Sequence, residues 1–187
     1  MLSADDELPS RPHRILVAGV SGAGKSTLCR RITAATGIPY TELDGLYHGP
    51  GWTPQPDFAQ TVERITARPD WVAEWQYRSV RPMLLERADL LVWLDLPFRT
   101  TLRQVVRRTL RRRMRREVLW NTNTEPPLRT FFTDRDHIVR WAIRTRHKYR
   151  TLIADLERQP DAPVLVRLRS RREVRRWLAG PLTRAVR

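Results

Sequence analysis

Short apolar runs alternate with amphipathic stretches along this 187-residue chain. The apolar runs predict five buried strands, at 14–19, 38–43, 71–75, 88–96 and 164–168. Between them, apolar residues return at steps of three and four and predict helices over 25–36, 58–65, 102–114, 138–156 and 173–178. Strands that alternate with helices favour an α/β fold of three layers, a parallel sheet of about five strands with helices on both faces.

The segments between these elements indicate one domain. Residues 45–57 are rich in Gly and Pro and residues 120–133 hold Asn and Pro, so both predict loops. Residues 1–13 begin acidic, contain two prolines and predict a flexible N-terminal arm. We expect a single domain over 14–180 and a tail over 181–187, because no repeat or linker divides the chain.

Composition narrows the class of protein. Hydrophobic residues make up 41% of the chain, which is enough for a sizeable core. The first residues contain no apolar segment typical of a secretory signal, and no apolar run approaches the ~20 residues of a membrane span. The single cysteine, Cys29, excludes an internal disulfide framework. We therefore expect a cytoplasmic protein without a membrane partner.

The net charge of +15 has two interpretations. Of the 35 basic residues only Lys25 and Lys148 are lysines, and this arginine bias is typical of a GC-rich genome. The other interpretation is a polyanionic partner. A nucleic-acid partner is disfavoured because the basic residues are scattered and no nucleic-acid-binding module is recognisable.

The strongest motif follows the first predicted strand. Gly19–Thr27 (GVSGAGKST) matches G-x-x-x-x-G-K-[ST], between a strand and a helix as the motif requires. Backbone amides of such a loop surround phosphate oxygens, Lys25 reaches the β- and γ-phosphates of ATP, and Ser26 supplies a hydroxyl to Mg²⁺. The residues predicted to bind the nucleotide are Gly19, Ser21, Gly22, Ala23, Gly24, Lys25, Ser26 and Thr27.

Four stretches together resemble a known family. Gly19–Thr27, Leu43–Trp52 (LDGLYHGPGW), Trp71–Arg78 (WVAEWQYR) and Ala88–Pro97 (ADLLVWLDLP) follow one another as in the adenylate-kinase-like small P-loop kinases. They are most similar to the branch called topology modulation proteins. The resemblance implies a P-loop NTPase fold of the nucleoside-kinase type, with an acceptor-side region over 45–70 and a lid over about 107–133.

The resemblance also implies roles for three residues beside Lys25. Asp44 would orient or deprotonate the acceptor hydroxyl, or hold Mg²⁺ through water. Glu74 would join Ser26 in the Mg²⁺ site, and Arg78 would meet phosphate. Asp44 and Glu74 each have an ordinary alternative: Asp44 as a turn or helix cap, and Glu74 as a surface residue. The family has Asp and Gly where this chain has Glu74 and Trp75, and both changes alter the geometry around the metal.

Three functions remain open at this point. The first is ATP-dependent transfer of phosphate to a nucleotide, nucleoside or other small hydroxylated acceptor. The second is an ATP-binding regulator or ATPase without kinase activity, and the third is a nucleic-acid-associated ATP-binding protein. Seven arginines of the predicted helix 102–114 and its end offer candidates for a phosphate-clamping lid, and we expect only one or two to act. These are Arg107, Arg108, Arg111, Arg112, Arg113, Arg115 and Arg116.

Overall fold

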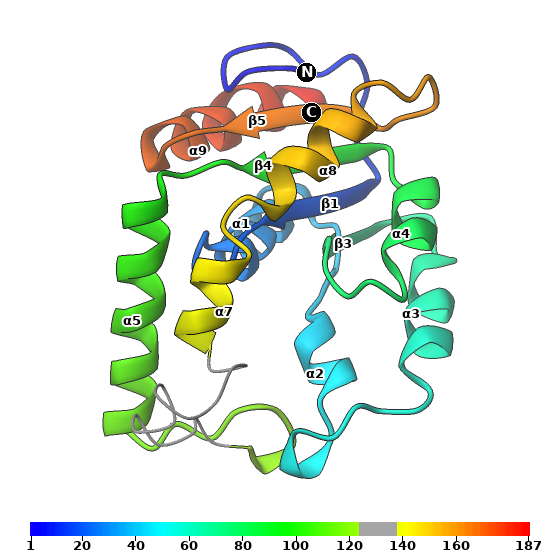
Figure 1. Ribbon diagram of the computed structural model, residues 1–187. Coiled ribbons are helices and arrows are strands. Elements are labelled where there is room, and N and C mark those ends of the chain that lie inside the picture. The colour runs from blue at the N-terminus through cyan, green and yellow to red at the C-terminus, as the bar shows by residue number, and fades with distance from the viewer. Residues whose placement is uncertain (124–137) are drawn as a thin grey trace.

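A five-stranded parallel sheet forms the centre of the computed structural model, which describes residues 1–123 and 138–187 (Figure 1). The strand order is β2-β3-β1-β4-β5. The strands are β1 (Arg14–Gly19), β2 (Tyr40–Thr41), β3 (Trp71–Glu74), β4 (Leu90–Leu94) and β5 (Val164–Leu168). In register, Val17 pairs with Glu74 on one side and with Val92 on the other. The carboxyl ends of β1, β3 and β4 therefore meet at one edge of the sheet.

Alternate residues of each strand feed two separate cores. Ile15 and Val17 pack into one core with Leu28 and Ile32 of α1. Leu16 and Ala18 point the other way, into a second core. A sheet buried on both faces explains why its strands are continuous apolar runs and do not alternate with polar residues.

The helices divide between these two faces. One face carries α1 (Lys25–Thr36), α9 (Arg171–Trp177) and the π-helix η3 (Leu178–Leu182), with the short α10 (Thr183–Ala185) following. The other carries α3 (Phe58–Thr66), α4 (Arg81–Arg87) and α8 (Lys148–Leu156). The remaining elements extend from the carboxyl edge of the sheet (Figure 1). They are α2 (Leu43–Tyr47), η1 (Pro50–Trp52), α5 (Phe98–Met114), η2 (Trp120–Thr122) and α7 (Ile138–Arg144).

The predicted three-layer fold is confirmed, and three local predictions need correction. The strand expected over 38–43 pairs only at Tyr40–Thr41, and α2 then occupies part of the expected strand and of the expected loop 45–57. The helix expected over 138–156 divides into α7 and α8. At the division, the Thr145 hydroxyl donates to the Trp141 carbonyl over 2.8 Å, a contact of the kind that bends helices.

Both chain ends pack against the domain. The Leu2 amide donates to the Leu165 carbonyl at 2.7 Å, and the Leu2 carbonyl accepts from the Arg167 amide at 2.9 Å. These bonds place the first residues beside β5, in contrast to the flexible arm expected over 1–13. In the expected tail over 181–187, the side chain of Leu182 is fully buried in the core that α1 covers.

Within the described parts of the chain, no helix is long and apolar enough to span a membrane.

Candidate active site

The phosphate loop joins β1 to α1 in a conformation that only glycine adopts without strain at two positions. Gly22 has φ of 77° and Gly24 has φ of 94°, both in the left-handed region. A Cβ on Gly22 would lie 2.5 Å from the Thr101 carbonyl oxygen and from Val105 Cγ2, so α5 packs directly against the loop. The loop turns tightly, with the Ala23 amide donating to the Val20 carbonyl at 3.0 Å. It leads into the amino end of α1, where a phosphate is favoured.

Glu74 is the charged centre beside this loop. Its side chain is buried at the end of β3, and its Oε1 accepts from the hydroxyls of Ser26 at 2.6 Å and Tyr40 at 2.9 Å. The Lys25 ammonium lies 3.7 Å from Oε2 of the same carboxylate. The structure thus brings Glu74 together with Lys25 and Ser26, and its burial excludes a freely solvated Glu74. Tyr40 is a partner that the sequence did not single out.

These charges set the protonation of the cluster. Burial disfavours the charged ammonium of Lys25, but Glu74, Tyr149 and Asp44 outweigh it, so the pKa of Lys25 lies above its ordinary value. Burial and the nearby Glu74 carboxylate raise the pKa of the Tyr40 hydroxyl. Both groups therefore carry their protons at neutral pH, Lys25 as a cation and Tyr40 as a neutral donor.

The oxygen donors at this point suit Mg²⁺. The ion prefers few protein ligands, all of them oxygens, and completes its shell with water and phosphate. Ser26 Oγ and the Glu74 carboxylate are donors of this kind. Since the Ser26 hydroxyl gives its hydrogen to Glu74, its lone pairs stay available to a cation. Over residues 1–123 and 138–187, no group of three or more His, Cys, Asp or Glu side chains forms a dedicated metal cage.

Asp44 occupies a second corner at the same edge of the sheet. It lies in the first turn of α2, not at the end of a strand as expected, because β2 ends at Thr41. Asp44 Oδ1 accepts from Gln76 Nε2 at 2.7 Å and from the Tyr77 hydroxyl at 2.5 Å. Among the described residues nothing donates a hydrogen bond to Oδ2, so this oxygen is available to a ligand.

Aromatic rings surround the Asp44 corner. Tyr77 stacks on Tyr47 with ring centroids 4.2 Å apart, and Phe58 meets Tyr77 edge-on at 5.0 Å. His48 Nε2 lies 3.3 Å from the Tyr77 hydroxyl, and the His48 ring lies parallel to Trp120 at 6.2 Å. These rings give the corner the apolar wall and few polar groups that a small-molecule site requires.

The segment that follows α5 docks on this wall. Asn123 is buried; its Oδ1 accepts from the Trp52 amide at 3.1 Å and its Nδ2 donates to the Gly49 carbonyl at 2.9 Å. Asn121 also donates to the His48 carbonyl. The part of the predicted lid over 107–123 thus reaches the acceptor-side region, while residues 124–133 of that lid lie outside the described residues.

Several predicted residues lie elsewhere. The Arg78 side chain is exposed and the described residues give it no hydrogen-bond partner, whereas Arg81 lies over the Trp75 ring at 5.8 Å. Asp95, which directly follows β4, contacts Arg167 and lies 3.7 Å from Arg150, so these three side chains form a structural ion cluster. Two of the candidate lid arginines, Arg111 and Arg112, lie 3.3 and 3.7 Å from the carboxylate of Glu117.

Gln76 and Tyr77 are site residues that sequence reasoning did not assign. A signal was available: both follow β3, whose carboxyl end lies beside the phosphate loop. Trp120 and Asn123 carried no such signal, because they lie far along the chain from the loop that they contact. Asn123, for example, is 71 positions from Trp52 and 74 from Gly49.

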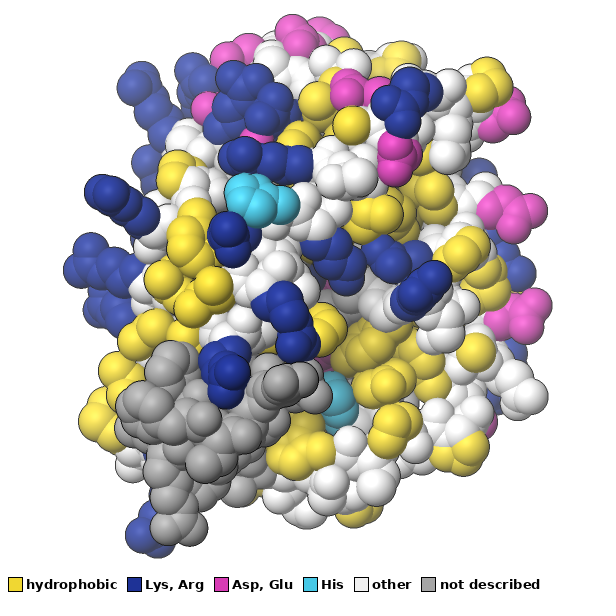
Figure 2. Space-filling model, in the orientation of Figure 1, with side chains coloured by type: hydrophobic (Ala, Val, Ile, Leu, Met, Phe, Trp, Pro, Cys, Tyr) yellow, Lys and Arg dark blue, Asp and Glu magenta, His cyan; other side chains and the backbone are white. Residues whose placement is uncertain are grey.

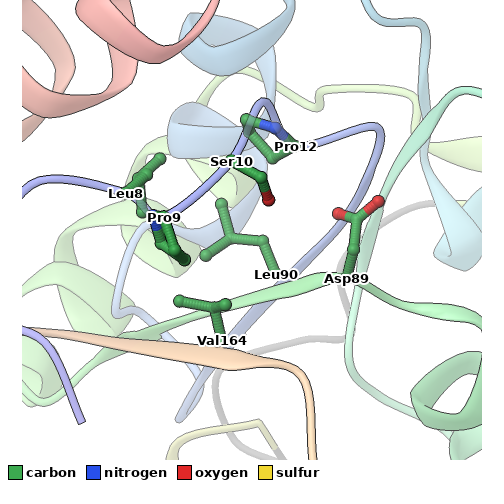
Figure 3. A pocket seen from close by; sticks show the side chains of 7 residues that line it. All are labelled: Leu8, Pro9, Ser10, Pro12, Asp89, Leu90 and Val164. Atoms are coloured by element: carbon green, nitrogen blue, oxygen red, sulfur yellow. The ribbon is translucent and has the colours of Figure 1, made fainter.

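Charged side chains are unevenly distributed over the surface, and a small pocket lies away from the phosphate loop. On the face shown in Figure 2, Lys and Arg side chains gather over the left side and the centre, and acidic side chains lie at the top and right margin. A small pocket occurs at the opposite, amino end of the strands, where Leu8, Pro9, Ser10 and Pro12 meet the start of β4 and β5 (Figure 3). There the backbone amides of His13 and Arg14 donate hydrogen bonds to the Asp89 carboxylate. The pocket is separate from the phosphate loop, because that loop lies at the carboxyl end of β1.

Comparison with known proteins bears on the fold. No family model matches the chain, and no curated protein sequence matches it. Among solved structures it is similar to a gluconokinase from Sinorhizobium meliloti 1021, with 23% identity, a TM-score of 0.52 and coverage of 94% of this chain and 95% of that one. A shikimate kinase from Bacteroides thetaiotaomicron is similar at 14% identity and a TM-score of 0.51, with 90% and 95% covered. These likenesses show the fold of small P-loop kinases.

Proposed function

We propose that the protein is an ATP-dependent phosphotransferase acting on a small hydroxylated acceptor. The observation that carries this proposal is the pairing of two corners at one sheet edge. One corner is a phosphate loop with Lys25 and Ser26 against a buried carboxylate, and the other is Asp44 with a free oxygen in an aromatic wall. A simple nucleotide binder needs only the first corner. The structural likeness to gluconokinase and shikimate kinase supports the same conclusion.

The first corner holds the nucleotide and the metal. The loop amides and Lys25 would bind the β- and γ-phosphates of ATP, with Thr27 and the small residues Gly19, Ser21 and Ala23 completing the loop. Ser26 and Glu74 would hold Mg²⁺, which neutralises charge on the phosphates. Since Glu74 already orients Ser26 and faces Lys25, its principal task in this proposal is to fix both groups for the nucleotide.

The second corner handles the acceptor. Asp44 Oδ2 accepts the proton of the acceptor hydroxyl as the acceptor oxygen bonds to the γ-phosphorus. The bond from that phosphorus to the bridging oxygen breaks, and ADP leaves with the electron pair. Gln76 and Tyr77 hold Oδ1 from the other side, so the carboxylate cannot rotate away. The docked segment 120–123 would help exclude water, which competes with the acceptor for the γ-phosphate.

The proposal does not depend on two of the predictions from sequence, the role of Arg78 and membership of the topology modulation branch. Arg78 stays a candidate phosphate contact only if its exposed side chain turns inward when substrates bind. Membership of the topology modulation branch also stays a prediction, since the structural neighbours support the broader class of small P-loop kinases.

Coupled ADP release tests the proposal, with a panel of hydroxylated acceptors and mass-spectrometric detection of phosphorylated products. We expect slow ATP consumption alone and faster consumption with the right acceptor. Asp44→Asn should lose most of that increase and keep ATP binding, because the amide cannot accept the proton. Lys25→Ala should weaken ATP binding by about 10- to 100-fold, the loss of a charge-assisted hydrogen bond.

Each alternative predicts a different result. Fast hydrolysis that needs no acceptor and that Asp44→Asn leaves untouched would identify an ATPase. Tight ATP binding with no turnover on any acceptor would identify a regulator. Either result would overturn the kinase proposal.

A further inference from the structure

His48, the residue that follows α2, contacts two parts of the site at once. Its ring nitrogen Nε2 lies 3.3 Å from the hydroxyl of Tyr77, and that hydroxyl donates to Asp44 Oδ1. The face of the same ring lies along Trp120 of η2, with the two planes 26° apart and the centroids 6.2 Å apart. The His48 carbonyl also accepts from the Asn121 side chain. His48 therefore links η2 to the Asp44 corner.

The hydrogens along this chain of contacts can run in only one direction. The Asp44 carboxylate can only accept, so the single hydrogen of the Tyr77 hydroxyl is committed to Oδ1. Burial and Asp44 raise the pKa of Tyr77, so this hydrogen stays in place at neutral pH. Toward His48 the Tyr77 oxygen can then only accept, and Nε2 must carry the hydrogen between them. A donor behind a hydroxyl strengthens the hydrogen bond that the hydroxyl makes in front.

The surroundings of the His48 ring fix its orientation. Tyr47 and Trp52 meet the ring edge-on, with centroids 4.9 and 5.1 Å away. The other ring nitrogen, Nδ1, is buried, and none of the described residues forms a hydrogen bond with it. A hydrogen on Nδ1 would be a buried donor without an acceptor, which is costly. The site therefore favours the tautomer whose hydrogen is on Nε2 and points it at Tyr77.

The position of η2 bears directly on the His48 ring. A Cβ on Gly45 would lie 2.9 Å from Trp120 Cδ1, so η2 packs against α2 with no space between them. Asn123, directly after η2, bonds to the Gly49 carbonyl and the Trp52 amide, on the far side of His48 in the chain. Withdrawal of η2 would thus remove the surface on which the His48 ring lies.

We propose that His48 is a positioning residue for phosphate transfer, which aligns Asp44 through Tyr77 while η2 is docked. The inference rests on the proposed function, in which Asp44 accepts the proton of the acceptor hydroxyl. It deepens that function by coupling the alignment of the proton acceptor to the segment that excludes water. Gln76 holds the same Asp44 oxygen independently, so loss of the His48 contact slows transfer and does not abolish it.

NMR of the full chain with isotope-labelled histidine tests the chain of hydrogen bonds without any need for turnover. The protein has four histidines, and His48→Phe assigns the His48 signals by their loss. We expect the nitrogen shifts of a ring whose hydrogen is on Nε2. Tyr77→Phe removes the acceptor and should change the Nε2 shift, and Asn123→Ala, which loosens η2, should change it in the same direction. A hydrogen on Nδ1, or an Nε2 shift that Tyr77→Phe leaves unchanged, would overturn the inference.

A double-mutant cycle in the coupled ADP-release assay tests the positioning role itself. His48→Phe keeps an aromatic ring against Trp120 and removes the N–H. It should lower kcat with acceptor by about three- to tenfold and leave the KM for ATP unchanged, because the phosphate loop is untouched. In the Tyr77→Phe background the same substitution should lower kcat no further, since His48 acts through that hydroxyl. His48→Gln, whose amide can place an N–H near the position of Nε2, should retain more kcat than His48→Phe.

A matched control and two contrary results complete the experiment. His13→Phe makes the same substitution at an exposed position directly before β1 and should leave kcat unchanged. Losses of kcat from His48→Phe and Tyr77→Phe that multiply in full would overturn the positioning role in an active enzyme. A wild type without acceptor-dependent ADP release would overturn the proposed function and the positioning role together, and a hydrogen bond detected by NMR would then be purely structural.

Discussion

Tyr77 donates its phenolic hydrogen to Asp44 Oδ1 over 2.5 Å from a backbone with φ of 58°. A bulky residue in this left-handed region costs on the order of 1–3 kcal/mol, and such strain gathers at functional sites. Stacking on Tyr47 and edge contact with Phe58 hold the ring in place. Burial and the Asp44 carboxylate raise the pKa of Tyr77, so it stays a donor across the neutral range.

Tyr77→Phe should lower kcat by about tenfold, because Asp44 loses one of the two donors that orient it. The affinity for ATP should not change, since the phosphate loop is untouched. Tyr47→Phe is the matched control: it removes a hydroxyl from the other ring of the same stack, and none of the described residues bonds to that hydroxyl. Equal losses of kcat in the two variants would contradict a positioning role for Tyr77.

Gly22→Ala should cost more stability than Gly24→Ala. Both positions have positive φ, so both substitutions introduce strain. Only at Gly22 would the new methyl also meet α5, 2.5 Å from two atoms, whereas a Cβ on Gly24 has open space. We expect a difference of about 1–3 kcal/mol in the free energy of unfolding, measured in urea. Equal losses of stability in the two variants would mean that α5 can shift to accommodate the methyl group at position 22 without a loss of stability.

The pKa of Lys25 should lie above 10.5, the ordinary value for a lysine, and the pKa of Lys148 should lie below it. Burial lowers the pKa of Lys25, but Glu74 and other groups raise it further; burial, Arg81 and Lys25 lower the pKa of Lys148. The interaction of Lys25 with Glu74 therefore stabilises the folded state fully below pH 10.5. This stabilisation is lost as the pH rises through the pKa that Lys25 has in the folded protein. Lys148 has the opposite sign: its protonated form is disfavoured in the fold, so its contribution improves as the pH rises through its lowered pKa.

NMR of the labelled lysine side chains measures both titrations, since only two signals are present and Lys25→Ala assigns them. Arg81→Gln should move the Lys148 titration toward higher pH, because one repelling charge is removed. A single common pKa for the two lysines would contradict the arrangement of charges described above.

Asn123→Ala should loosen the contact between segment 120–123 and the acceptor-side region. The change leaves the Trp52 amide and the Gly49 carbonyl without their partner, at about 1–3 kcal/mol for each group that stays buried. We expect a lower melting temperature and more ATP hydrolysis without acceptor. Thr122→Ala, at an exposed neighbouring position, should change neither. If Asn123→Ala hydrolyses ATP no faster than the wild type without acceptor, segment 120–123 does not help to exclude water from the site.

The sheet and the phosphate loop were predictable because each rests on local sequence. Buried strands such as β4 read as continuous apolar runs, and the loop is a contiguous motif whose helix, α1, has the bounds that the sequence predicts. The position of Glu74 followed from its place at the end of β3.

The acceptor side was less predictable because tertiary contacts form it. Asp44 was expected at a strand end, but pairing of β2 stops after Thr41 and a helical turn takes over. A role was assigned to Arg78, but it is Arg81, in the first turn of α4, whose side chain lies over Trp75. The docking of Asn123 involves a separation of over 70 residues, which no local pattern encodes.

The bonds between Leu2 and β5 also bear on how the molecule behaves in concentrated solution. An open strand edge offers unpaired amides and carbonyls to other chains and promotes aggregation. Here the Leu2 backbone caps part of the β5 edge, and at the other edge β2 is only two residues long. Neither edge of the sheet therefore offers a long unpaired strand to another chain. Deleting the first few residues would uncover one of these edges and lower the solubility of the protein before it affected the catalytic side.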